Sequence, residues 1–234
     1  MNAVTRILAM LAAGLILSAQ AHAAGLADIS SKDAGTGLKE ALTQGAQAAV
    51  SALGKPGGFL ANDRVKIPLP ESLRKIEGLM RGLGMGKYAD ELVTTMNRAA
   101  ETAVVEAKPL LVNAVKNMSV QDAKGILAGG EDAATQYFRR STSAALSDKF
   151  LPIVKMATQR VKLADKYNEF AGKGAKLGLI DQKDADLNNY VTQKALDGLF
   201  LMIAEEEEKI RKDPTPIKKR QRQADACVIA LRCA

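Results

Sequence analysis

Histidine is almost absent from this chain of 234 residues, and tryptophan is absent altogether. The single histidine, His22, lies in an N-terminal segment that we expect to be removed, so the mature protein would have none. This excludes Ser-His-Asp and Cys-His nucleophiles and histidine-ligated metals, while carboxylates, lysine, tyrosine and arginine remain available for catalysis. Aromatic residues make up 4% of the chain, too few for the stacking platforms that bind sugars or bases. We expect no metal, no cofactor and no catalytic residue, although composition alone leaves enzymatic activity undecided.

Cysteine is also scarce, because Cys227 and Cys233 are the only two and both lie near the C-terminus. In an oxidising compartment two cysteines can form a disulfide. A spacing of six residues places them on nearly opposite faces of a helix, so a bridge would require an irregular tail. Whether they pair stays open, and a bridge would fasten only a terminus.

A long apolar run occurs only near the start of the chain. After residue 24 no unbroken apolar run is longer than six residues. Arg6 is followed by an apolar stretch at 7–17 and then by Ala-His-Ala at 21–23. A positive charge, a short apolar run and a small-residue cleavage site define a secretory signal peptide, and the run is shorter than the roughly 20 residues that span a membrane. We predict a signal peptide at 1–23, cleavage after Ala23, and a mature protein that is periplasmic or secreted and not transmembrane.

The formal charge of +7 is unevenly distributed. The segment 214–234 holds five cations against Asp225, so the rest of the chain is close to neutral; the cations are Lys218, Lys219, Arg220, Arg222 and Arg232. A nearly neutral body argues against binding of nucleic acid. The basic tail could make weak contact with anionic lipid or an envelope polymer, but a solvated, disordered tail is the simpler interpretation. The partners of the protein stay unknown.

Apolar residues recur at helical spacings throughout the mature chain, and no run alternates with the period of a β-strand. The pattern predicts helices at about 30–53, 70–83, 87–107, 110–118, 119–128, 131–146, 162–171 and 186–212. Prolines require extended backbone at 65–70, and Pro152 predicts a kink or a restart of the helix. We therefore expect an all-α fold, a single-domain multi-helix bundle over 24–213, followed by a basic, disordered tail at 214–234.

The last predicted helix is long, and we expect it to be buried at the centre of the bundle. From Ala195 to Ala204 every residue except Asp197 is apolar or glycine, and a helix that is apolar on all sides is a buried one. Gly198 costs this helix about 1 kcal/mol relative to alanine, so we expect another helix to cross closely there. Beyond it, the end of the helix is expected to project into water and to carry three i,i+4 ion pairs: Glu205–Lys209, Glu207–Arg211 and Glu208–Lys212.

Five short stretches of the chain are distinctive in combination. They are Ile-Pro-Leu-Pro-Glu from Ile67, Met-Asn-Arg-Ala-Ala-Glu from Met96, Gly-Ile-Leu-Ala-Gly-Gly from Gly125, Tyr-Phe-Arg-Arg from Tyr137 and Asp-Gly-Leu-Phe from Asp197. Together they resemble a bacterial family of unassigned activity, domain-of-unknown-function family 4197, over about 25–213. The resemblance implies an exported, helical, single-domain protein and supplies no reaction, ligand or catalytic residue. Family members look as though they end soon after the last helix, so the tail at 214–234 departs from the pattern.

Two groups of residues are candidates for binding a ligand or an anion. Arg139 and Arg140 lie beside three hydroxyl residues that include Thr142, and such a group can grip a phosphate or carboxylate. Alternatively the hydroxyls bond back to the helix carbonyls, which we favour. In the last helix Asp197 shares a face with Lys194, and a carboxylate in an apolar segment can act as an acid or base. A structural Lys194–Asp197 pair, or an exposed helix edge, is the simpler interpretation.

Two further stretches resemble binding loops but have the wrong spacing. The glycines at 82–86 lack the fourth glycine and the hydroxyl residue of a phosphate loop, so we expect a turn between helices. The acidic residues from Asp184 lack the glycine and the final glutamate of a calcium loop, so we expect helix capping.

The sequence therefore predicts an exported helical protein of unassigned biochemical activity, and a non-catalytic interaction or structural protein is the first hypothesis. The alternative is a helical carrier that binds an apolar or anionic small ligand between its helices. A hydrolase or lyase that uses a carboxylate, lysine and arginine is the third and least supported.

Overall fold

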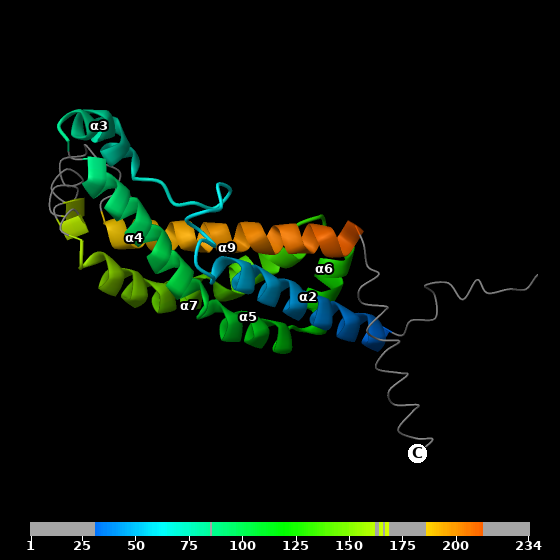
Figure 1. Cartoon of the computed structure of the whole chain (residues 1–234). Coiled ribbons are helices and arrows are strands. Elements are labelled where there is room, and N and C mark those ends of the chain that lie inside the picture. Colours follow the sequence, from blue (N-terminus) through cyan, green and yellow to red (C-terminus); the bar gives the residue numbers. More distant parts are fainter. Residues whose placement is uncertain (1–30, 85, 162–163, 166, 169–185, 213–234) are drawn as a thin grey trace, which may run out of the picture. The chain divides into compact units, whose positions relative to one another are not determined.

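The computed structural model describes residues 31–84, 86–161, 164–165, 167–168 and 186–212 (Figure 1). The chain divides into a unit of residues 1–36 and a unit of residues 37–234. The described part of the first unit is 31–36, the start of a helix, and the second unit holds all other described residues. The predicted signal peptide at 1–23, the predicted tail at 214–234 and both cysteines lie outside the described residues.

Every regular element in the described residues is an α-helix, which confirms the all-α prediction. The helices are α2 (Ser31–Leu53), α3 (Glu71–Gly82), α4 (Gly86–Val104), α5 (Ala107–Lys116), α6 (Val120–Ala128), α7 (Ala133–Thr158) and α9 (Leu187–Lys212). None of these helices has the length and hydrophobicity that crossing a membrane requires. The helix predicted at about 162–171 lies mostly outside the described residues.

Local sequence signals set several of the helix ends. The Ser119 hydroxyl accepts from the amide of Asp122, whose carboxylate accepts from the amide of Ser119, so a complete capping box begins α6. The predicted turn between α3 and α4 contains Gly84 with a φ of 73°, a conformation that glycine adopts without strain. Asp186 accepts from the amide of Asn188 at 2.7 Å, which caps the start of α9 as expected.

The core of the second unit is built around α7 and α9, and α4 packs against both (Figure 1). The two long helices run in opposite directions, because Thr158 at the end of α7 meets Asn188 at the start of α9. Buried apolar side chains lie on several sides of α9: Leu187, Val191, Ala195, Leu196, Leu199, Phe200 and Ile203. This confirms the prediction of a long, buried C-terminal helix in the bundle.

The helix α7 decides against one of the two alternatives predicted from Pro152, a restart of the helix. This proline lies inside one continuous helix, so the helix does not restart there. A proline removes one backbone hydrogen bond and crowds the preceding turn. Phe150 and Val154, on either side of Pro152, have no exposed surface, and their packing in the core holds the helix together across the proline.

The segment 54–70, between α2 and α3, contains turns and extended backbone, and Asn97 of α4 fastens part of it. The side-chain oxygen of Asn97 accepts from the amide of Ile67 at 2.8 Å. Its side-chain nitrogen donates to the carbonyl of Ile67 at 2.9 Å and to that of Val93 at 2.8 Å. Buried backbone groups must be paired, and this single side chain pairs both groups of Ile67.

Glu101, one turn further along α4, fastens another part of the same segment. Its Oε1 accepts from the amides of Phe59 and Leu60, each at 3.1 Å, and its Oε2 accepts from Arg98 at 2.7 Å. Burial alone would raise the pKa of Glu101. The hydrogen bonds from Leu60, Arg98 and Phe59 outweigh that effect, so the pKa of this carboxyl lies below its ordinary value.

Gly198 packs closely, as predicted, but against a different neighbour. A Cβ atom at this position would lie 2.7 Å from Cε1 of Phe59 and 3.2 Å from Cβ of Val65. Both residues belong to the segment 54–70, so the close approach is to irregular backbone and not to another helix. A glycine is required because the Phe59 ring occupies the space of a side chain.

We expect Gly198→Ala to lower the free energy of unfolding by about 1–3 kcal/mol, because the new methyl group overpacks the contact with Phe59. Helix propensity alone would favour the alanine by roughly 1 kcal/mol. Urea denaturation measures the sign. Gly125→Ala in α6 is the matched control, because a Cβ there would meet nothing within 4 Å, and it should stabilise. A gain in stability for Gly198→Ala would show that the Phe59 ring moves aside at no cost.

The charged end of α9 differs in part from its prediction. The last two of the three predicted i,i+4 pairs form. The first does not, because Glu205 pairs with Arg64 at 2.6 Å and Lys209 pairs with Glu206 at 2.6 Å. Glu207 is 5% exposed, so this end of the helix does not project wholly into water.

Candidate functional site

The hydroxyl residues beside Arg139 and Arg140 are used within α7. The hydroxyls of Ser141, Thr142 and Ser143 each donate to the carbonyl one turn earlier, at 2.6–2.8 Å. Thr142 is buried, whereas both arginines are exposed. The structure therefore does not gather the three hydroxyls and the two arginines around a common point.

The two arginines act separately. The Arg139 guanidinium lies 4.6 Å from the ring centre of Phe200 and 3.8 Å from a carboxylate oxygen of Asp197, both in α9. Arg140 lies near Asp122, whose pKa is lowered mainly by hydrogen bonds from Ser119 and to a lesser extent by the charge of Arg140. Exposed contacts of this kind contribute little stability.

Lys194 and Asp197 lie in one open groove over α9. The groove has a volume of about 690 Å³, and Arg74, Ser147 and Tyr190 are among its other walls. The Lys194 ammonium lies 5.9 Å from the ring centre of Tyr190. Asp197 accepts from the side-chain amide of Gln193 at 3.2 Å. Lys194 and Asp197 therefore contact other residues and do not pair with each other. The groove contains both positive and negative side chains, so it indicates no particular ligand.

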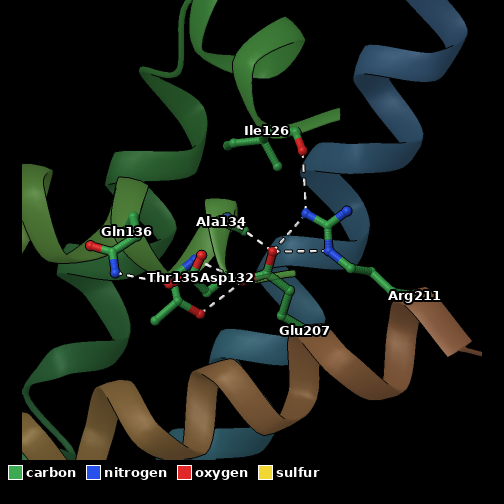
Figure 2. Close-up of polar contacts among 7 residues, drawn as sticks. All are labelled: Ile126, Asp132, Ala134, Thr135, Gln136, Glu207 and Arg211. Carbon is green, nitrogen blue, oxygen red and sulfur yellow. Dashed lines mark hydrogen bonds and ion pairs between the residues drawn. The ribbon is translucent and has the colours of Figure 1, made fainter. Parts of the chain in front are cut away.

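A buried polar cluster lies around Glu207, where α9 meets the start of α7 (Figure 2). Its Oε1 accepts from the amide of Ala134 at 3.0 Å, and its Oε2 accepts from the amide and the hydroxyl of Thr135, each at 2.8 Å. Arg211 donates to Oε1 from Nε at 3.1 Å and from Nη2 at 2.7 Å. Asp132, the residue before α7, makes no side-chain cap. Glu207 therefore caps the first turn of α7, whose amides have no partner within the helix.

The capping role of Glu207 was missed in the sequence, where Glu205–Glu208 were considered as one charged run. A signal for it exists, because Ile203, Glu207 and Ile210 follow the spacing i, i+4, i+7. Glu207 therefore continues the buried stripe of α9. A buried carboxylate must find hydrogen-bond donors, and the uncapped start of another helix supplies them.

A small, mostly apolar pocket lies beside Glu207, between α2, α6, α7 and α9. Its volume is about 250 Å³, and its walls are Gly37, Leu38, Ala41, Leu42, Ile126, Leu127, Ala134, Glu207, Ile210 and Arg211. At Gly45 a Cβ atom would lie 3.3 Å from Cδ1 of Ile210, so α2 and α9 meet closely nearby. Pockets for small molecules are largely apolar with a few polar groups, and the charged side chains of this wall are Glu207 and Arg211.

The family comparison matches residues 28–221 to DUF4197, a family of proteins of unknown function. The chain belongs to DUF4197. This confirms the family inferred from the five stretches, and the match extends past residue 213 into the predicted tail. Comparison with curated proteins and with solved structures finds no match.

The stretches that resemble DUF4197 have structural roles in this chain. Asn97 and Glu101 fasten the segment 54–70, and Gly198 makes room for Phe59 in that segment. The Tyr137 hydroxyl donates to the carbonyl of Ala114 in α5 at 2.7 Å. These contacts hold together the fold of this chain, and they identify no reaction.

Proposed function

We propose that this protein is exported and acts without catalysis, as a helical carrier of a small apolar ligand. The observation that carries the proposal is the apolar pocket beside Glu207. Its volume of about 250 Å³ is slightly below the lower limit of roughly 300 Å³ for pockets that hold drug-sized molecules. The ligand is accordingly small.

Two buried carboxylates support a non-catalytic role. Glu101 and Glu207 each accept from two backbone amides and from an arginine. A general acid or base must reach a substrate and exchange a proton with it near neutral pH. The hydrogen bonds of these two groups instead commit them to holding a segment and capping a helix.

Filling the pocket tests the carrier function. Ala41→Phe places a ring into the pocket, whereas Ala48→Phe changes an exposed position of the same helix and is the matched control. We expect calorimetry with hexan-1-ol to show saturable binding to the wild type and to Ala48→Phe, and binding weaker by about tenfold or more to Ala41→Phe. Circular dichroism checks that both variants are folded. Equal binding by the two variants would place the ligand elsewhere, and no binding to the wild type would reject a carrier of such ligands.

An interaction protein is the second candidate, because α6 presents apolar side chains to solvent. Val120 is 73% exposed and Leu127, at the edge of the pocket, is 53% exposed. Exposed apolar residues that lie together mark protein contact sites. A partner that co-purifies with the wild type and is lost with Val120→Ser and Leu127→Ser, while hexan-1-ol still binds, would favour this function over the carrier.

The intact mass of the protein tests whether its signal peptide is removed on export. The small-residue pattern at 21–23 is what signal peptidase cuts, so we expect the protein recovered from the cell envelope or medium to have the mass of residues 24–234. Ala23→Leu should block this cleavage and leave the full-length mass. Wild-type protein that keeps its first 23 residues in these fractions would contradict the proposal.

A further inference from the structure

We propose that the ligand of this pocket is an anionic amphiphile, with its alkyl chain between the helices and its carboxylate on Arg211. The inference rests on the proposed carrier function and names the chemical class of the ligand. It follows from three features of the pocket: the polar groups at one end, their remaining capacity for hydrogen bonds, and the local balance of charge.

The pocket has a polar end and an apolar body. Leu38, Leu42, Ile126 and other apolar residues of α2 and α6 form the body, and Glu207 and Arg211 of α9 form the polar end. An occupant that matches both parts is an amphiphile with one polar group. A wholly apolar occupant would exclude water from Arg211 without supplying a hydrogen-bond acceptor in its place, which costs free energy.

The remaining hydrogen-bond capacity belongs to Arg211. Glu207 already accepts five hydrogen bonds: from the Ala134 amide, from the Thr135 amide and hydroxyl, and from Nε and Nη2 of Arg211. Nη2 of Arg211 also donates to the carbonyl of Ile126 at 3.2 Å. The hydrogen bonds of Arg211 to described residues all come from Nε and Nη2, and in Figure 2 one nitrogen of the guanidinium carries no dashed line. The Arg211 side chain is 32% exposed and belongs to the pocket wall.

The wall of the pocket suits an anion better than a cation. The charges of Glu207 and Arg211 cancel, and Asp132 lies at the start of α7 beside Glu207, so the remaining hydrogen-bond capacity decides between the two. The carboxylate of Glu207 has its lone pairs occupied, so an ammonium group would find no acceptor there and would face Arg211. A carboxylate instead receives a charge-assisted hydrogen bond from Nη1, and such bonds are about twice as strong as neutral ones.

Three probes with the same alkyl chain test this proposal by calorimetry at pH 8: octanoate, octan-1-ol and octylammonium. We expect octanoate to bind the wild type about tenfold more tightly than octan-1-ol, and octylammonium to bind more weakly than either. High salt should reduce the preference for octanoate. Arg211→Gln should abolish the preference by weakening octanoate alone, and Lys212→Gln, an exposed neighbour in the same helix, should leave it intact.

The outcomes separate this inference from the proposed function. Equal binding of octanoate and octan-1-ol by the wild type, or a preference that survives Arg211→Gln, overturns the assignment of the anion to Arg211 and leaves the carrier function standing. Failure of all three probes to bind overturns both. The comparison of probes on the wild type needs no variant, so it decides the matter even if Arg211→Gln does not fold.

Discussion

Glu207→Ala is expected to lower the free energy of unfolding by about 3 kcal/mol, the largest effect of any single substitution considered for this protein. The change removes the acceptor for two amides and one hydroxyl at the start of α7. It also leaves the guanidinium of Arg211 without its buried partner. Breaking a buried pair on one side costs about 3–5 kcal/mol, and the partial exposure of Arg211 reduces that figure.

Glu208→Ala is the matched control for this experiment. Glu208 is the next residue of the same helix, is exposed, and pairs with Lys212 on the surface. Such surface pairs are worth roughly 0–1 kcal/mol. Urea denaturation followed by circular dichroism at 222 nm compares both variants with the wild type. Equal losses for the two would mean that the cap on α7 contributes no more than a surface ion pair.

Acidification is expected to destabilise the protein in part through Glu101. The pKa of this carboxyl is below its ordinary value in the folded state, so the unfolded state binds the proton more readily. The stabilisation is therefore fully present above the unfolded value of about 4.3 and is lost as the pH falls through the lower, folded value. Within that window, protonation removes the charge that the Phe59 and Leu60 amides and Arg98 hold.

Glu101→Gln isolates this contribution. We expect the variant to be less stable than the wild type by about 2 kcal/mol at pH 7, because a charge-assisted acceptor becomes a neutral one. The difference should shrink as the pH falls below about 4, where the wild-type carboxyl also becomes neutral. Glu106→Gln, at an exposed position after α4, should show no such trend. If the difference in stability between Glu101→Gln and the wild type does not change with pH, the charge of Glu101 is not the source of that stability.

Most of the helices could be predicted from the sequence because their signals are local. The capping box at Ser119 and the glycines around Gly84 depend on neighbours only a few residues away. The burial of α9 was also predictable, since its apolar residues cover several faces of one helix. The helix does not restart at Pro152, because the packing of Phe150 and Val154 outweighs the loss of one backbone hydrogen bond.

The partners of individual side chains were harder to predict, because they come from distant parts of the chain. Gly198 indicates a close approach, but periodicity cannot say that an irregular segment makes it. Glu205 pairs with Arg64 of that same segment, which a helix-only pattern does not anticipate. The pocket is formed by residues of four helices. Its walls could not be predicted, because the sequence pattern identifies single helices and not how they pack together.

The candidate residues of the sequence and those of the structure therefore differ. Arg139 was chosen for the hydroxyl residues that follow it, and Asp197, with Lys194 on the same face, for its charge within an apolar stretch. All three lie toward solvent. Glu207 and Arg211 were considered as surface charges because they belong to the charged end of the last helix. Both groups of candidates consist of charged residues and differ in burial. Burial depends on how the helices pack against one another, which the sequence pattern does not give.

The cap on α7 has a consequence for how the protein is made. Glu207 follows Thr135 by 72 positions, so a ribosome completes α7 long before it adds the side chain that caps it. The apolar faces of α4 and α7 that pack against α9 likewise stay uncovered until α9, the last of the described helices, is synthesised. Chains that stop short of α9, through premature termination or proteolysis, leave these faces uncovered and are candidates for aggregation and degradation. Closure of the core therefore requires a chain that includes α9.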